Sequence, residues 1–201
     1  MQKLAVALGW VLLVMPGGPL GADPLVRSLQ VHSEVREGRT WTNQAAQVEL
    51  WTDQSVEGLL AVITDWPSYP RVFRQIIQAD PEGSGSEFLL HEATSIPVLG
   101  VSIINRFVLR MQTGLRDDGS GFLRWTQEST DGTIDHLVGG WELIPSTRNG
   151  RSGTLIVYSN ASSVLEVLPG QSLVVGIFYA GALKDTVTAA VGEARRRKEK
   201  S

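Results

Sequence analysis

The chain has 201 residues, of which 42% are hydrophobic and 19% are charged, and this composition suits a folded domain rather than a disordered chain. The 18 basic and 21 acidic residues give a net charge of −3, which disfavours a general nucleic-acid-binding protein. There is no cysteine, so disulfides, thiolate metal sites and thiol nucleophiles are excluded.

The first 22 residues have the pattern of an export signal. Lys3 is their only charge, an apolar run follows from Leu4 to Val14, and a segment rich in proline and glycine ends at Ala22. This order of charged, apolar and small residues predicts a secretory signal peptide cleaved after Ala22, and hence a periplasmic or secreted protein. An uncleaved N-terminal anchor is the alternative, although the apolar run is short for a bilayer.

Behind the signal peptide (1–22) we expect one domain with short extensions. Residues 23–39 are polar without a clear period and are interpreted as a lead-in segment. The domain should cover residues 40–198, followed by a polar tail over 199–201. Within it, residues 40–52 interleave apolar and polar side chains, as expected of a strand pair or one bent strand.

Two short helices are predicted next. Asp53 and Ser55 can both cap a helix N-terminus, and apolar residues then recur at helical spacing. This helix should end near Thr64, because Pro67 and a second proline follow and each disfavours helix at the residue before it. A second helix is expected over residues 71–75.

The middle of the chain has the pattern of an antiparallel meander. Asp-Gly, Asn-Gly and other turn sequences separate apolar runs, and such short connections favour antiparallel pairing. We therefore expect at least five strands. The runs are Glu87–Thr94, Val101–Thr113, Phe122–Ser129, Thr133–Pro145 and Thr154–Asn160.

A long amphipathic helix should end the domain, from residue 172 to about residue 198. Its apolar residues form one stripe, as expected of a helix packed on a sheet. The stripe consists of Ala180, Leu183, Val187, Ala190, Val191 and Ala194. Helices on one face of an antiparallel sheet define the α+β class, and the space between the two layers can hold an apolar pocket.

Three stretches make the sequence resemble the START/polyketide-cyclase superfamily (SRPBCC, helix-grip), in particular its bacterial START-like and coenzyme Q-binding type. Residues 60–73 have a helix end in threonine–aspartate–aromatic followed by tyrosine–proline, residues 140–158 resemble the late strand pair, and the C-terminal helix completes the pattern. The resemblance implies a helix-grip fold, in which a curved antiparallel β-sheet wraps around a long C-terminal helix and two short helices follow the first strand. It also implies a pocket for a hydrophobic small molecule.

Strand alternation predicts which side chains line this pocket. If the face with Trp125 is the inner one, its strand turns Glu128 outward, and Trp141 and Leu143 likewise turn Glu142 outward. The lining is then apolar, with Asn105 and Gln127 as isolated polar groups that orient a ligand. The predicted lining residues are Phe73, Asn105, Phe107, Leu109, Met111, Trp125, Gln127, Trp141, Leu143, Phe178 and Leu183.

In the resembling fold, Trp66, Tyr69 and Phe73 border the pocket mouth. These aromatic residues are interpreted either as a gate that touches membranes or as packing of the interhelix turn onto the sheet. The basic end of the chain, residues 195–200, has the same two interpretations: a contact with anionic lipid, or cations favoured at a helix C-terminus.

Catalytic machinery is sparse in the sequence. There is no nucleophile elbow, and no histidine has a second ligand at a zinc-site spacing, so we predict no catalytic residue, no metal and no cofactor. His91–Glu92 and Asp135–His136 are adjacent pairs that a strand turns to opposite faces. The candidates for acid–base work are Glu92, Glu128, Asp135, His136 and Glu142.

The leading hypothesis is an exported monomer that binds a lipid, sterol, quinone or similar hydrophobic molecule and carries it between membranes. Its partners would be that ligand and, transiently, a membrane, but no nucleic acid. We favour a binding protein over an enzyme. The alternatives are a polyketide cyclase or dehydratase with an acid, base or hydroxyl in its pocket, and a protein-interaction domain whose groove is filled by its own side chains.

Overall fold

The computed structural model describes residues 23–98, 101–166 and 171–200, so the predicted signal peptide lies outside the described residues. In chain order, the elements are β1 (Leu25–Arg36), β2 (Arg39–Thr52), α1 (Val56–Ile63), the 3-10 turn η1 (Trp66–Ser68), α2 (Tyr69–Val72), β3 (Ile76–Glu82), β4 (Glu87–Val98), β5 (Val101–Leu115), β6 (Gly121–Thr130), β7 (Ile134–Arg148), β8 (Arg151–Leu165) and α3 (Gln171–Lys198).

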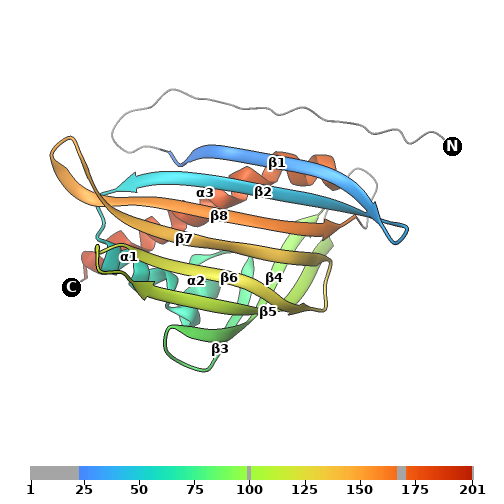
Figure 1. Ribbon diagram of the computed structural model, residues 1–201, viewed down its shortest axis with the longest axis horizontal. Coiled ribbons are helices and arrows are strands. Elements are labelled where there is room, and N and C mark those ends of the chain that lie inside the picture. The colour runs from blue at the N-terminus through green and yellow to red at the C-terminus, as the bar shows by residue number, and fades with distance from the viewer. Residues whose placement is uncertain (1–22, 99–100, 167–170, 201) are drawn as a thin grey trace.

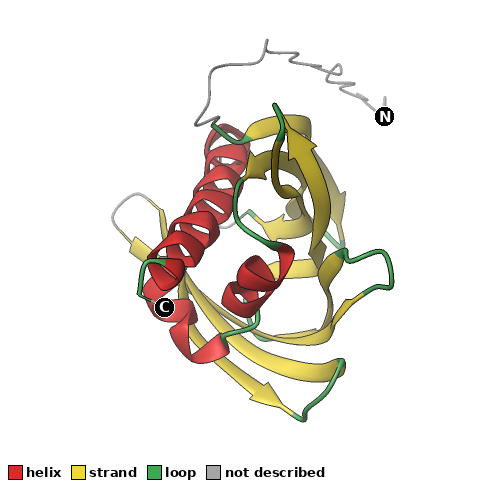
Figure 2. Ribbon diagram, turned by 90° about the vertical axis from the view of Figure 1, so that its left-hand side faces the viewer, coloured by secondary structure: helices red, strands yellow, loops and turns green. Residues whose placement is uncertain are grey.

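The strands form one antiparallel sheet in the order β1-β2-β8-β7-β6-β5-β4-β3 (Figure 1). Because β2 pairs with β8, the early hairpin joins the late strands, and the remaining strands follow as a meander. Figure 2 shows the sheet curving around α3, with the short helices beside it. The predicted α+β helix-grip fold is confirmed.

Two strands lie where none was predicted. Residues 25–36, interpreted as a lead-in, form β1 and pair with β2 from Leu25↔Glu49 to Arg36↔Arg39. Most of its side chains are exposed, as are those of β3 at the other edge. Edge strands are held by backbone pairing on one side and need no apolar alternation, so periodicity did not reveal them. Residues 39–52 form a single strand rather than a strand pair.

The predicted start and end of α1 are confirmed, whereas α2 begins earlier in the chain than predicted. The Ser55 hydroxyl accepts a hydrogen bond from the Gly58 N–H at 3.1 Å, and the helix ends at Ile63, directly before Thr64. The second helix begins at Tyr69, not at residue 71, because Pro70 occupies the first turn, where its missing N–H costs nothing.

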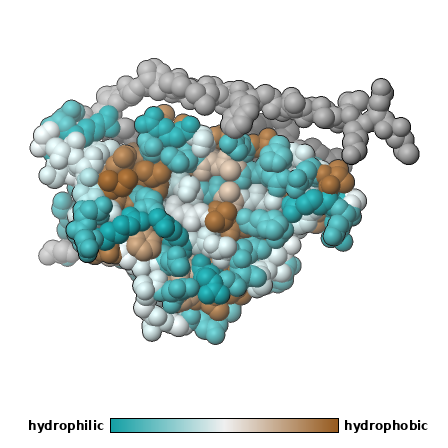
Figure 3. Space-filling model, viewed as in Figure 1, coloured by the Kyte–Doolittle hydropathy of each residue, from teal (hydrophilic) through white to brown (hydrophobic). Residues whose placement is uncertain are grey.

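The helices also bridge the two edges of the sheet. α2 packs on β3, α3 packs on β1 and β2, and α2 contacts α3, so the helical layer spans from one edge to the other. Within the described ranges, no helix is long and apolar enough to cross a membrane. Hydrophilic side chains cover most of the outer face of the sheet, and the hydrophobic ones form small separate patches (Figure 3).

Candidate functional site

The inner face of the sheet carries most of the predicted lining residues. Alternation along β5 and β6 turns Arg106, Arg110 and Arg124 outward and their neighbours inward, as predicted. The inner residues contribute to the core, and their contact with a ligand stays a prediction. The buried members of the predicted set are Phe73, Asn105, Phe107, Leu109, Met111, Trp125, Trp141, Leu143 and Leu183.

The two polar residues of the predicted lining hold the β6–β7 connection together. Asn105 Oδ1 accepts hydrogen bonds from the Thr133 N–H at 2.7 Å and from its hydroxyl at 3.0 Å. Gln127 Oε1 accepts from the Leu137 N–H at 3.1 Å, beyond the point where backbone pairing of β6 and β7 stops at Thr126↔Val138. These amide oxygens therefore replace missing backbone partners. Asn105 Nδ2 is buried without a hydrogen-bond partner among the described residues, and ligand contact by either side chain stays a prediction.

Phe178 does not share the inner face, contrary to its predicted place in the lining. Its side chain is 68% exposed. Phe178 and Leu183 are five residues apart, which places them about 140° from each other around the helix axis. The buried stripe therefore extends from Leu183 to the half-buried Tyr179, four residues earlier.

The aromatic turn near the predicted pocket mouth is packed into the core. Trp66, Tyr69 and Phe73 are all buried, and their rings contact one another with centroids 4.9 and 4.8 Å apart. The Tyr69 hydroxyl donates to the Ile63 carbonyl at 2.5 Å. These contacts agree with the packing interpretation of the turn.

Glu92 is an ionisable residue on the inner-facing side of β4. On β4 it shares a face with Leu90 and Thr94, which are both buried, while His91 is exposed on the opposite face. Burial raises the pKa of Glu92 from its ordinary 4.5 to about 8. In the part of the chain that the structure describes, no residue donates a hydrogen bond to its carboxyl group.

Glu92 also retains accessible surface, unlike its neighbours on the same face. It is only partly buried, whereas Leu90 is 0% and Thr94 is 8% exposed. Glu92 lines a hollow of about 440 Å³ at the sheet, together with Phe107, His91 and Arg106. From the sequence, Glu92 is an acid–base candidate but not a predicted lining residue. Alternation with Phe88 and Leu90 was the signal that could have placed it there.

Two tyrosines face the same region from other elements. Burial, and then the nearby charge of Glu92, raises the pKa of Tyr69 on α2. Burial raises the pKa of Tyr158 on β8 in the same way, with the charges of Tyr179 and Glu92 contributing. The Tyr158 ring lies 4.4 Å from that of Trp141, and its hydroxyl has no hydrogen-bond partner among the described residues.

The other acid–base candidates lie outside this region. Glu128 pairs with Arg110 at 2.6 Å, and Glu142 pairs with Arg116 at 2.8 Å, both on the outer face as predicted. Asp135 and His136 do contact each other, contrary to prediction, with His136 Nε2 3.0 Å from Asp135 Oδ2. A β-bulge gives His136 a φ of 52°, so the two side chains do not alternate.

Two hollows of about 220 and 440 Å³ lie at the sheet. The larger one is lined by Glu92 and Phe107 together with outward-facing residues such as His91 and Arg106. In the larger one, His91 pairs with Glu82 at 2.7 Å and Arg106 approaches Asp131 at 4.0 Å. No cluster of three or more potential metal-ligating side chains occurs in the described ranges.

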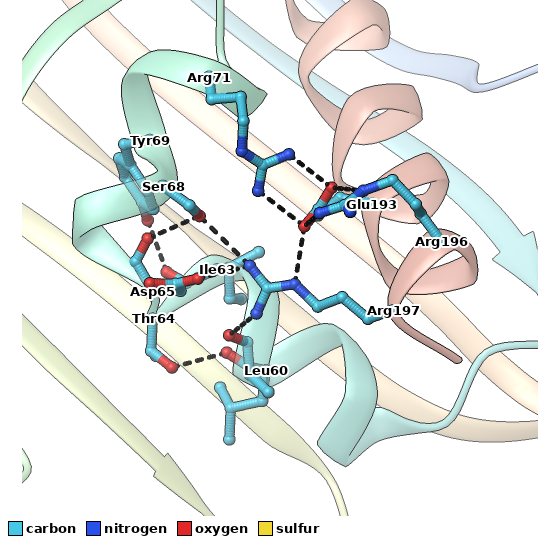
Figure 4. A network of polar contacts seen from close by, with 11 residues as sticks. Leu60, Ile63, Thr64, Asp65, Ser68, Tyr69, Arg71, Glu193, Arg196 and Arg197 are labelled. Atoms are coloured by element: carbon cyan, nitrogen blue, oxygen red, sulfur yellow. Dashed lines mark hydrogen bonds and ion pairs between the residues drawn. The ribbon is translucent and has the colours of Figure 1, made fainter. Parts of the chain in front are cut away.

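The basic end of the chain is partly engaged in an ion-pair network around Glu193 (Figure 4). The Glu193 side chain is 5% exposed and receives Arg71 of α2 through two hydrogen bonds of 2.9 and 3.0 Å. Arg196 and Arg197 also donate to it, and Arg197 reaches Asp65 at 2.5 Å. Bonds to Arg71 and the other two arginines hold the pKa of Glu193 far below its usual range.

The comparisons with known proteins agree on the fold. No protein-family model matches the chain, and no curated protein matches its sequence. Among solved structures, a STAR-related lipid transfer protein fragment from Xanthomonas axonopodis superposes with a TM-score of 0.63 at 14% identity, over 83% of this chain and 98% of that one. Human StAR-related lipid transfer protein 5 superposes with a TM-score of 0.62 at 11% identity, over 85% of this chain and 88% of that one.

An enzyme of the same fold is similar as well. The Zhui aromatase/cyclase from a Streptomyces species superposes with a TM-score of 0.55 at 15% identity, over 77% of this chain and 95% of that one. The chain therefore has the START-like helix-grip fold. At these identities the likeness defines the architecture, which lipid transfer proteins and cyclases share.

Proposed function

We propose that this protein binds a hydrophobic small molecule between the inner face of the sheet and α3, and that it acts as an exported carrier of that molecule between membranes. The observation that carries the proposal is the helix-grip fold that the chain shares with two lipid transfer proteins, in which a curved sheet surrounds the C-terminal helix. The inner face of the sheet is apolar and aromatic, with Phe107, Trp141 and Tyr158.

Apolar burial would supply most of the binding energy. Each Å² of apolar ligand surface removed from water contributes roughly 25 cal/mol, and the few polar groups set orientation. The START-like fold of two lipid transfer proteins supports this class of ligand. Export is proposed from the N-terminal sequence, because a carrier is needed where an aqueous compartment separates two membranes.

The test is native mass spectrometry of residues 23–201 purified from the native host, followed by solvent extraction. A hydrophobic molecule bound at a ratio near one to one is expected. Glu92→Phe should place a bulky ring on the inner-facing side of β4 and weaken ligand binding, whereas Glu87→Phe on the exposed side of β4 should keep it. An empty protein that takes up none of the lipids, sterols or quinones added to it would overturn the proposal and favour an interaction domain.

The cyclase alternative rests on a specific observation, the chemistry of Glu92. A carboxyl group with a pKa of about 8 can give or accept a proton near neutral pH, which is what acid–base catalysis requires. An enzyme would convert a poly-β-ketone thioester to a ring, and Glu92→Gln should lower the rate at least 100-fold. Glu87→Gln removes the same charge from the exposed side of β4 and should leave the rate unchanged.

A further inference from the structure

Two buried side chains that face each other across β4 and β5 have atoms without a hydrogen-bond partner. Thr94 and Asn105 are directly opposite in the strand register, and the side chains of such a pair lie on the same face of the sheet. Thr94 is 8% and Asn105 is 0% exposed. Among the described residues, neither Thr94 Oγ1 nor Asn105 Nδ2 has a hydrogen-bond partner. A hydroxyl and an amide NH₂ group therefore lie on neighbouring strands without bonding to each other.

The orientation of the Asn105 amide is fixed by its oxygen. Oδ1 accepts from the Thr133 N–H at 2.7 Å and from the Thr133 hydroxyl at 3.0 Å, so both of its acceptor positions are used. A backbone N–H only donates, so a flipped amide would place two donors against each other. The backbone at Gly132 also packs against Asn105, because a Cβ there would overlap its side chain. Nδ2 therefore points away from Thr133.

We infer that Thr94 and Asn105 form a polar subsite for a neutral oxygen, so that the hydrophobic ligand of this protein carries a carbonyl or hydroxyl group. This inference rests on the proposed binding function and specifies its ligand class. Its basis is the pair of unpartnered groups on the inner-facing side of β4 and β5. The next pair on that side, Glu92 and Phe107, lines the hollow of about 440 Å³. Open space thus begins two residues from the subsite, about 7 Å along the strands.

The chemistry of the two groups selects an oxygen acceptor. Asn105 Nδ2 only donates and the Thr94 hydroxyl donates as well, so one oxygen placed between them accepts two hydrogen bonds. A carbonyl oxygen has two lone pairs for these bonds, and a hydroxyl oxygen accepts in the same way. An alkane leaves both donors unsatisfied, and an ammonium group brings only further donors. A carboxylate would accept as well, but its charge makes burial more costly than that of a neutral oxygen.

Hexanophenone and hexylbenzene test the inference, because they differ only in a carbonyl in place of a CH₂ group. Each displaces the fluorescent probe N-phenyl-1-naphthylamine from the purified protein, and each affinity is compared with that of the wild type. Thr94→Val removes the hydroxyl and keeps the branched shape, so it should weaken hexanophenone about tenfold and leave hexylbenzene nearly unchanged. Thr94→Ser keeps the hydroxyl and should bind hexanophenone within about threefold of the wild type. Thr126→Val removes the same group from the exposed side of β6 and should change neither affinity.

A second measurement observes Asn105 directly. In ¹⁵N-labelled wild-type protein, the side-chain N–H signals of Asn105, assigned by their loss in Asn105→Asp, should move downfield with hexanophenone but not with hexylbenzene. Such a shift is expected of a donor that gains a hydrogen-bond partner. If circular dichroism shows that Thr94→Val does not fold, these signals decide the question.

The outcomes separate this inference from the proposed function. If Thr94→Val weakens both ligands equally or neither of them, or if the Asn105 signals do not respond to hexanophenone, the subsite is overturned and hydrophobic binding stays intact. The pair is then satisfied by buried water instead of a ligand oxygen. If neither the probe nor either ligand binds to the wild type, the proposed function fails and the inference fails with it.

Discussion

Two carboxyl groups of this protein have opposite environments. Glu92 has no hydrogen-bond or ion-pair partner among the described residues, and burial raises its pKa to about 8. Glu193 receives three arginines, and their hydrogen bonds lower its pKa despite its burial. Glu193 therefore contributes stability at pH values above 4.5, its ordinary pKa, and this contribution is lost as the pH falls below that value. Glu92 behaves in the opposite way, because ionisation in the folded state is unfavourable.

Replacing Glu92 by glutamine should stabilise the protein at neutral and alkaline pH. Between pH 4.5 and about 8 the unfolded state has released the Glu92 proton and the folded state has not, so stability falls with rising pH. The slope is about 1.4 kcal/mol per pH unit at most, and the change levels off above pH 8.

Urea unfolding of the wild type and Glu92→Gln at pH 4.5, 7 and 9 measures this difference. The two curves should nearly coincide at pH 4.5 and separate by a few kcal/mol at pH 9. Glu87→Gln, on the exposed side of β4, should show no such trend. A constant difference between wild type and Glu92→Gln at all three pH values would contradict the assignment.

At the scale of elements, the α2–α3 contact closes the gap between the sheet edges. β3 contacts α2, β1 contacts α3, and the two helices are joined through Arg71 and Glu193 (Figure 4). Arg197 extends the same network to Asp65, in the turn after α1. The C-terminal end of α3 is thus held against the short helices. Any opening of the interior by these elements must either break this network or move them together.

Glu193→Ala should destabilise the fold and free this end of α3. Removing the shared acceptor takes a partner from Arg71 and Arg196, while Arg197 keeps its contact with Asp65. The cost should be about 2–3 kcal/mol, moderated by the exposure of the guanidinium groups. Hydrogen exchange of backbone amides should speed up in residues 186–198 and in α2.

Glu199→Ala is the matched control, because Glu199 lies near the same helix end but is exposed. It should change stability by less than about 0.5 kcal/mol and leave the exchange rates as they are. Faster exchange spread evenly over the whole sheet in Glu193→Ala would argue against a local role for the network.

At the scale of the whole molecule, the sheet order decides what the interior can hold. Pairing of β2 with β8 places the N-terminal hairpin beside α3, and the curved sheet then extends to β3 under the short helices. The inner face thus gathers residues that are far apart in the chain, such as Glu92 and Tyr158. A ligand held there would contact several strands at once and so stabilise the entire fold.

A bound ligand should therefore raise the unfolding temperature in one cooperative transition. At a free concentration 100 times its dissociation constant, the gain is about 2.7 kcal/mol. Calorimetry with a neutral hydrophobic ligand measures it, and the tryptophan fluorescence of Trp125 and Trp141 should change together with the heat signal. A ligand that shifts fluorescence without raising the unfolding temperature would bind outside the core.

Local patterns in the sequence determined much of this architecture. The capping residue Ser55 and the prolines after Thr64 set the bounds of α1, and alternation predicted the inner faces of β5 and β6. Each of these depends on residues that are near in sequence. The chain's likeness to the START-like fold was predicted for the same reason, since its motifs at residues 60–73 and its C-terminal helix are local.

Only the tertiary structure decided the roles of the polar residues. The amide oxygens of Asn105 and Gln127 accept hydrogen bonds from backbone N–H groups of the β6–β7 connection, which depends on where pairing stops, and their contact with a ligand stays a prediction. The pKa of Glu92 is raised because residues distant in sequence desolvate its carboxyl group. The burial and the electrostatic environment of a side chain depend on residues that are distant in sequence, and local periodicity carries no information about those residues.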